Sequence, residues 1–164
     1  MKKEIADLSE GLESCVIMSA SSQIPIKELV EKIKMMGGKE PVQLFDPAAV
    51  ISSKHILAAY VNARLAFNER RNIAKTLGME MLLFLSMQRK IDEALRIAGA
   101  KSEKDFVLFC GNARLYDRVS RYIIRSKRFR KDAAESKKSA RMLGLESTDQ
   151  GEIMERMAES RMLE

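Results

Sequence analysis

The side chains in this chain that are capable of chemistry are few and scattered. His55 is the single histidine, Cys15 and Cys110 are the two cysteines, and Glu80 is a lone acid within an apolar run. A hydrolytic triad needs a nucleophile, a base and an orienting group close together, and a zinc site needs several His or Cys residues at ligand spacing. We therefore expect no catalytic residue, no metal, no cofactor and no enzymatic activity.

Each of these side chains has an ordinary structural interpretation beside a functional one. Cys15 and Cys110 lie in apolar, strand-like runs and are expected to be buried small hydrophobes rather than reactive thiols. His55 lies toward the polar side of a predicted helix, which favours a solvent-facing or capping residue over a metal ligand. Glu80 is expected to pair with an Arg or Lys rather than to act as a catalytic carboxylate.

Neither glycine-containing stretch is a good match for a phosphate-binding loop. Gly37-Gly38 lacks the further glycines and the Lys-Ser/Thr pair that such loops use. The segment "CGNAR", which begins at Cys110, is only weakly similar to the anion site between a strand and a helix. An ordinary strand-to-helix turn remains the simpler interpretation of that segment.

Positive charge is the chemistry that the sequence does offer. The 164 residues carry a formal net charge of +6. The segment from Arg114 to Arg141 holds 11 Lys/Arg against 3 Asp/Glu, a charge of +8, so the remainder is close to −2. A basic segment of this kind favours a polyanionic partner, with nucleic acid first and a membrane surface second.

Five arginines of this segment recur at helical spacing. Steps of four, three, four and three residues would align them as one stripe on a helix. They are Arg114, Arg118, Arg121, Arg125 and Arg128. The stripe is either a solvated helix face or a surface that contacts a phosphate backbone through bidentate arginines. Because aromatic residues make up only 5% of the chain, recognition of an RNA backbone or end is expected rather than base stacking.

Alternating strand and helix patterns predict a mixed α/β (α+β) fold with a small central sheet of about four strands, several packed helices and a helical C-terminal region. Short apolar runs predict strands within residues 14–21, 41–47 and 105–110. Helices are predicted from Pro25 to Gly37-Gly38, from Ser52 or Ser53 onward, over residues 77–85, and from a Ser86 cap to Gly99.

The chain is expected to form one domain over residues 1–164, because no Pro-rich or Ser-rich linker divides it. Residues 125–140 are polar enough to form a basic mobile linker before a C-terminal helix over residues 148–164. The methionines of that helix either dock on the protein's own core or form an adaptable partner surface. No apolar run approaches the ~20 residues of a membrane span, and the N-terminus turns acidic where a signal peptide turns apolar. A cytoplasmic protein is therefore expected.

Three stretches together resemble a known family. They are "VQLFDPAAVISSKHILAAYVNARLAF", "RNIAKTLGMEMLLFLSMQRKIDEALRIAGA" and the strand "DFVLFC". From about Cys15 to Cys110 the chain resembles the small subunit of the KEOPS complex, also called the PRPK-binding protein (TPRKB-like) family, of the archaeal type. The Arg-rich stretch from Arg125 to Lys138 has no counterpart in that family.

The resemblance implies a non-catalytic protein that binds a small atypical kinase/ATPase of the PRPK type. Through this kinase it would belong to the complex that makes threonylcarbamoyl-adenosine next to the tRNA anticodon, with indirect links to the other KEOPS subunits. It also implies binding of tRNA at the 3′ CCA end, and no membrane partner. The alternative is a free-standing basic RNA- or DNA-binding domain that needs no kinase.

Two groups of residues follow as site hypotheses. The expected RNA contacts are basic residues, with the last three as a second patch: Arg64, Arg70, Arg71, Lys75, Arg89, Lys90, Arg118, Arg121 and Arg125. The expected kinase contacts are apolar residues: Ile91, Leu95, Ile153 and Met157.

Overall fold

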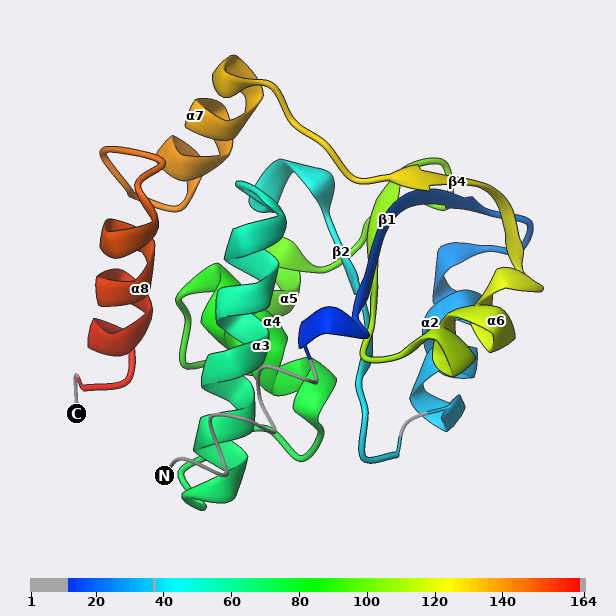
Figure 1. Ribbon diagram of the computed structural model, residues 1–164, viewed down its shortest axis with the longest axis horizontal. Helices are drawn as coiled ribbons and strands as arrows, with labels where there is room; N and C mark the ends of the chain where they lie inside the picture. Colours follow the sequence, from blue (N-terminus) through cyan, green and yellow to red (C-terminus); the bar gives the residue numbers. More distant parts are fainter. Residues whose placement is uncertain (1–11, 37, 163–164) are drawn as a thin grey trace.

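An antiparallel sheet lies between two groups of helices in the computed structural model, which describes residues 12–36 and 38–162 (Figure 1). The strands are β1 Val16–Ser22, β2 Val42–Phe45, β3 Phe106–Cys110 and β4 Ile123–Arg128. The helices are α2 Ile26–Met36, α3 Ser53–Asn68, α4 Leu77–Ser86, α5 Ile91–Ala98, α6 Ala113–Ser120, α7 Ala133–Met142 and α8 Gln150–Glu159, with a 3-10 turn η1 Pro47–Ala49.

The sheet has four strands in the order β2-β3-β1-β4, so β2 and β4 form its edges. Cys110 of β3 is opposite Val42 on one side and Val16 on the other, and Ala20 of β1 is opposite Ser126 of β4. The predicted α+β fold, with about four strands and helices at the C-terminal end, is confirmed.

Alternation along the strands divides the core between the two faces of the sheet. Phe45, Val107 and Phe109 belong to the cluster that the sheet shares with α3, α4 and α5. Leu44 and Leu108 point to the opposite face, where residues of α2 and α6 cover them. Figure 1 shows these two helix groups on the two sides of the strands.

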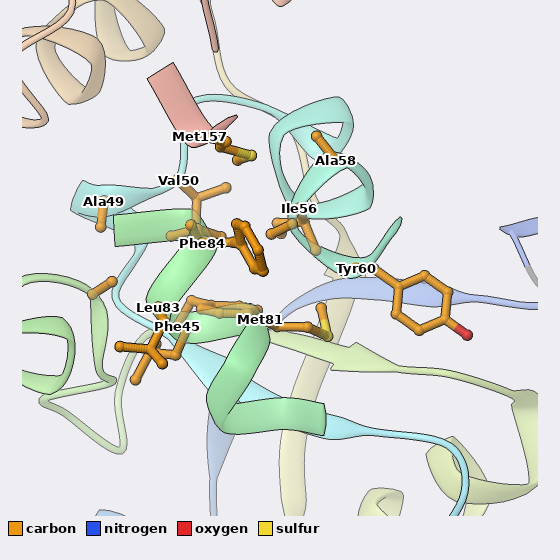
Figure 2. Close-up of a cluster of buried hydrophobic side chains, with 14 of the residues drawn as sticks. Phe45, Ala49, Val50, Ile56, Ala58, Tyr60, Met81, Leu83, Phe84 and Met157 are labelled. Carbon is orange, nitrogen blue, oxygen red and sulfur yellow. The ribbon is translucent and has the colours of Figure 1, made fainter. Parts of the chain in front are cut away.

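Helix α4 lies at the centre of the larger cluster. Its sequence is apolar nearly all round, and every residue from Glu80 to Ser86 is buried, as predicted for a central helix. Figure 2 shows Met81, Leu83 and Phe84 packed among side chains of β2 and α3, with Met157 of α8 reaching the same cluster. The C-terminal helix is therefore part of the core.

The predicted arginine stripe is wrong. Helix α6 ends at Ser120 and the chain re-enters the sheet as β4, so the last two arginines of the stripe lie on a strand. Arg125 is opposite Ser21 and Arg128 is opposite Met18 in the ladder with β1. The spacing matched a helix, but hydrogen bonding to β1 determines the local structure.

The expected basic linker over residues 125–140 is also wrong, because this stretch contains most of β4 and most of α7. Helix α7 begins with a capping box, in which Asp132 accepts the N–H of Glu135 and the Glu135 carboxylate accepts the N–H of Asp132. Phe129 and Ala140 are buried against the core. These contacts order a segment whose composition resembles that of a linker.

Smaller predictions differ in outcome. Ser52 caps α3 as expected. Ser86 does not cap α5; it ends α4, and its hydroxyl donates to the Leu83 carbonyl.

Gly37, one of the two glycines predicted to end α2, lies outside the described residues. Within the described part of the chain, no helix combines the length and apolar character needed to cross a membrane.

Candidate functional site

A groove of about 1020 Å³ opens beside the edge strand β2. Its walls come from α2, the end of α3, the start of α4 and α5. Val42, Leu44 and Leu77 are among its apolar residues, and Lys34, Lys39 and Lys75 are among its basic ones. The groove therefore combines an apolar lining with cations.

Arg64 lines the groove, but its charge is already compensated. Its guanidinium donates to Glu40 at 3.1 Å and to the Tyr60 hydroxyl at 2.8 Å, and Tyr60 donates to the other Glu40 oxygen at 2.8 Å. Burial raises the pKa of Tyr60 to about 12, so its hydroxyl stays protonated and remains a donor. Arg64 thus serves mainly to hold this network together.

The connection from α3 to α4, residues 69–76, carries three of the cations predicted from the sequence. We call it the basic loop. Arg70 follows α3 with a left-handed backbone (φ 56°), and Arg71 pairs with Glu69. Arg70 and Lys75 make no ion pair with any described residue, and both are exposed. Lys75 also lines the groove.

Arg89 and Lys90 lie in the connection between α4 and α5, and both are exposed. Burial lowers the pKa of Arg161, the nearby Glu80 raises it, and Arg89 and Arg71 lower it further. Since charges must be close to act in this way, Arg71, Arg89 and Arg161 occupy one region. Arg70, Arg71 and Lys75 thus lie before the start of α4, whereas Arg89 and Lys90 follow its end.

The second predicted patch is separate from this group. Arg118 and Arg121 are exposed at the end of α6, and Arg125 lies in β4 opposite Ser21 of β1. Tyr116 of α6 is 2.9 Å from Ser126 of β4 through their hydroxyl oxygens, so helix and strand form one surface. That surface lies at the sheet edge opposite β2.

The four predicted kinase contacts divide into two pairs. Ile91 and Leu95 are 38% and 45% exposed on α5 and border the groove. Ile153 and Met157 have no exposed surface, because α8 packs them into the protein's own core. Ile153 and Met157 therefore cannot contact a kinase in this structure.

Ile73 is a candidate that the sequence reasoning missed. It lies in the basic loop, is 42% exposed and lines the groove. A single isoleucine between Arg71 and Lys75 is a weak signal, but an apolar residue in a polar, basic loop could have indicated contact with a base or a partner.

His55 is a core residue, so its predicted position toward solvent is wrong. Its Nδ1 accepts the N–H of Ile51 at 3.1 Å, and its Nε2 lies 3.1 Å from the Leu85 carbonyl oxygen, to which it donates. Burial lowers the pKa of His55 to about 4. This neutral imidazole joins the start of α3 to the end of α4.

The remaining reactive groups also have structural roles. Burial raises the pKa of each cysteine thiol, Cys15 and Cys110, to about 12, which keeps both protonated and poorly nucleophilic. Asn112 caps α6 by accepting the N–H of Leu115, and a Cβ on Gly111 would lie 2.7 Å from a Glu40 carboxylate oxygen. A neighbouring carboxylate disfavours a phosphate there, so this segment is an ordinary turn.

Glu80 pairs with an arginine, as predicted: its Oε1 accepts from Arg161 at 2.7 Å. Among residues 12–36 and 38–162, no group of three or more His, Cys, Asp and Glu is arranged to hold a metal ion.

Residues 22–153 match the family model described as "Kinase binding protein CGI-121". This match includes the basic loop, the groove, α5 and the surface formed by α6 and β4. It also spans Arg125 to Lys138, the Arg-rich stretch that was expected to have no counterpart in the family. No curated protein matches the chain.

Proposed function

The chain belongs to the kinase binding protein CGI-121 family, and we propose that it is a non-catalytic accessory subunit that binds a PRPK-type atypical kinase/ATPase and helps to recruit tRNA. In this role it serves, within the KEOPS complex, the formation of threonylcarbamoyl-adenosine next to the anticodon. The family description supports a kinase partner. The tRNA and the assembly are inferred from the resemblance of the sequence and from the chemistry of the groove.

The observation that carries the RNA part is the groove with cations beside it. Phosphates need cations with free donors, and Arg70 and Lys75 are exposed cations without an ion pair among the described residues. Unpaired bases need apolar surface, which Leu77 and Ile73 supply. A volume of about 1020 Å³ is at the upper end of the usual ~300–1,000 Å³ range of ligand pockets. It therefore suits a short unpaired end, such as the 3′ CCA of tRNA, better than a duplex.

The proposed kinase contact is the exposed apolar pair Ile91 and Leu95 on α5. Protein interfaces place apolar residues at the centre and polar residues at the rim, and α5 has Asp92 and Arg96 as exposed polar neighbours of this pair. Since the pair also borders the groove, kinase and RNA would meet along α5. Such proximity is suited to a subunit that presents tRNA to a partner.

The test is charge reversal of Arg70 and Arg71 together. We expect the tRNA affinity of the double variant to fall and its dependence on salt to flatten by about one unit of slope per lost phosphate contact. Binding is measured by fluorescence anisotropy from 50 to 200 mM salt. The matched control reverses Lys137 and Lys138, an adjacent exposed pair on α7. If both double variants bind alike, Arg70 and Arg71 do not belong to the RNA site.

A further inference from the structure

Arg161 is an unusual arginine, because it follows the last helix of the described chain and yet is almost entirely buried. Its side chain is 10% exposed, and its guanidinium carbon lies 4.0 Å from the centre of the Phe84 ring. One of its terminal nitrogens donates to Glu80 at 2.7 Å, whereas its Nε has no hydrogen-bond partner among the described atoms. Burying an arginine costs desolvation free energy, which an ion pair offsets only where its geometry is good and the remaining donors find partners.

The carboxylate of Glu80 connects three parts of the chain. It belongs to α4 and is fully buried. Its Oε1 accepts from Arg161, and its Oε2 accepts the backbone N–H groups of Ile73 at 3.0 Å and Ala74 at 2.7 Å. Hydrogen bonds to an ionised carboxylate are about twice as strong as neutral ones. The Glu80 carboxylate therefore holds the basic loop through two backbone hydrogen bonds.

The basic loop has further anchors at its two ends. The N–H groups of Arg70 and Arg71 donate to the Phe67 and Ala66 carbonyls of α3, and Thr76 caps α4 by accepting the N–H of Met79. Ala74 is buried, and the Asn72 side chain donates to the Ala74 carbonyl at 3.0 Å, a contact within the loop itself. Arg70, Arg71, Ile73 and Lys75 are exposed. Between its two ends, the backbone bonds of Ile73 and Ala74 to Glu80 connect the middle of this loop to the core.

We propose that Arg161 is a positioning residue for RNA binding: its ion pair orients the Glu80 carboxylate, and Glu80 in turn fixes the basic loop beside the groove. This inference rests on the proposed function, since it concerns the same cations. Arg161 itself is not an RNA contact, because its guanidinium is already engaged with Glu80 and Phe84. A residue just after α8 thereby acts on a site whose cations lie about ninety residues earlier in the sequence.

Arg161→Met tests this link, because methionine keeps an apolar stem against Phe84 and removes the charge. We expect amide hydrogen exchange at Ile73 and Ala74 to become about tenfold faster, and tRNA affinity to fall by about tenfold, a typical coupling between linked sites. The salt slope should stay the same, because no phosphate contact is lost. Arg156→Met is the matched control: it removes the same charge from the exposed face of α8 and should change neither measurement.

Two further variants keep the test decisive. Arg161→Lys retains a cation and should recover part of the tRNA affinity. Glu80→Gln keeps the side-chain volume and one acceptor oxygen, so it tests the same link and should lose affinity as well, even if Arg161→Met does not fold.

The outcomes separate this inference from the proposed function. Wild-type protein that binds no tRNA overturns both. If wild-type protein binds tRNA and both Arg161→Met and Glu80→Gln bind it equally well, only the role of Arg161 is overturned. A salt slope about one unit smaller in Arg161→Met also overturns that role, because it would make Arg161 a direct phosphate contact.

Discussion

His55 illustrates how one buried polar residue can connect two helices. Its ring accepts from Ile51, just before α3, and donates to the last turn of α4, so both nitrogens are satisfied without a charge. A proton on Nδ1 would remove the acceptor and place a charge in the core, close to the cation of Lys131. The fold therefore requires the neutral imidazole.

This requirement predicts a pH-dependent loss of stability. The unfolded chain binds a proton at His55 below about pH 6.5, whereas the folded chain does so only near pH 4. Between these values the unfolded state holds more protons, so the free energy of unfolding should fall as the pH decreases, by on the order of 3 kcal/mol over the whole window. Urea unfolding at pH 7, 6, 5 and 4 measures the free energy of unfolding at each pH. In His55→Gln, this part of the pH dependence should disappear; an equally steep fall in that variant would assign the effect to other groups.

The chemistry of individual residues was easier to predict from the sequence than their partners. The pairing of Glu80 with a cation followed from its apolar surroundings, but Arg161 lies 81 residues away and was not a candidate. The basic residues near the groove could be chosen by type, yet the neutralisation of Arg64 by Glu40 depends on contacts between α3 and the loop before β2. Side-chain partners of this kind are determined by tertiary packing.

At the scale of elements, β4 shows the limit of periodicity. Arginines at three- and four-residue steps continue from α6 into residues 123–128, so a helix was the natural prediction. An edge strand needs only one covered face, and positive charges along a free edge help to prevent aggregation. Helices and strands with strong apolar patterns, such as α4 and β3, were predicted correctly, because there burial and local preference agree.

Helix α5 has two distinct faces, and this leads to a prediction about the kinase. Ala94 and Ala98 are buried, while Ile91 and Leu95 are exposed. Leu95→Glu leaves the buried face intact, so the variant should fold and lose affinity for a PRPK-type kinase by about tenfold or more, as expected for a central interface residue. Co-purification and calorimetry measure this loss. Ile124→Glu, a change at an exposed apolar residue of β4, serves as control. Wild-type affinity in Leu95→Glu would place the kinase elsewhere.

For the molecule as a whole, the sheet order keeps the two basic surfaces apart. The groove lies beside β2, and the surface of α6 and β4 lies at the other edge, about 14 Å away at the usual ~4.8 Å strand spacing. Figure 1 shows α6 beside β4, away from α5. The excess of positive charge was evident from the sequence, but its division between two edges follows only from the topology.

This separation predicts that the two surfaces contact different parts of a tRNA. Reversing Arg118 and Arg121 together should weaken binding of a whole tRNA and reduce its salt slope by up to about two units, since two exposed cations would leave the phosphate backbone. The same change should leave the affinity for a four-nucleotide CCA-ended oligonucleotide unaltered, because that ligand fits within the groove. The Arg70 and Arg71 reversal, in contrast, should weaken binding of both ligands. Anisotropy titrations of the two ligands against both double variants measure these differences.

If the Arg118 and Arg121 variant binds whole tRNA with wild-type affinity and salt slope, the surface of α6 and β4 is an ordinary solvated face. The groove with its basic loop would then account for the RNA binding that is measured.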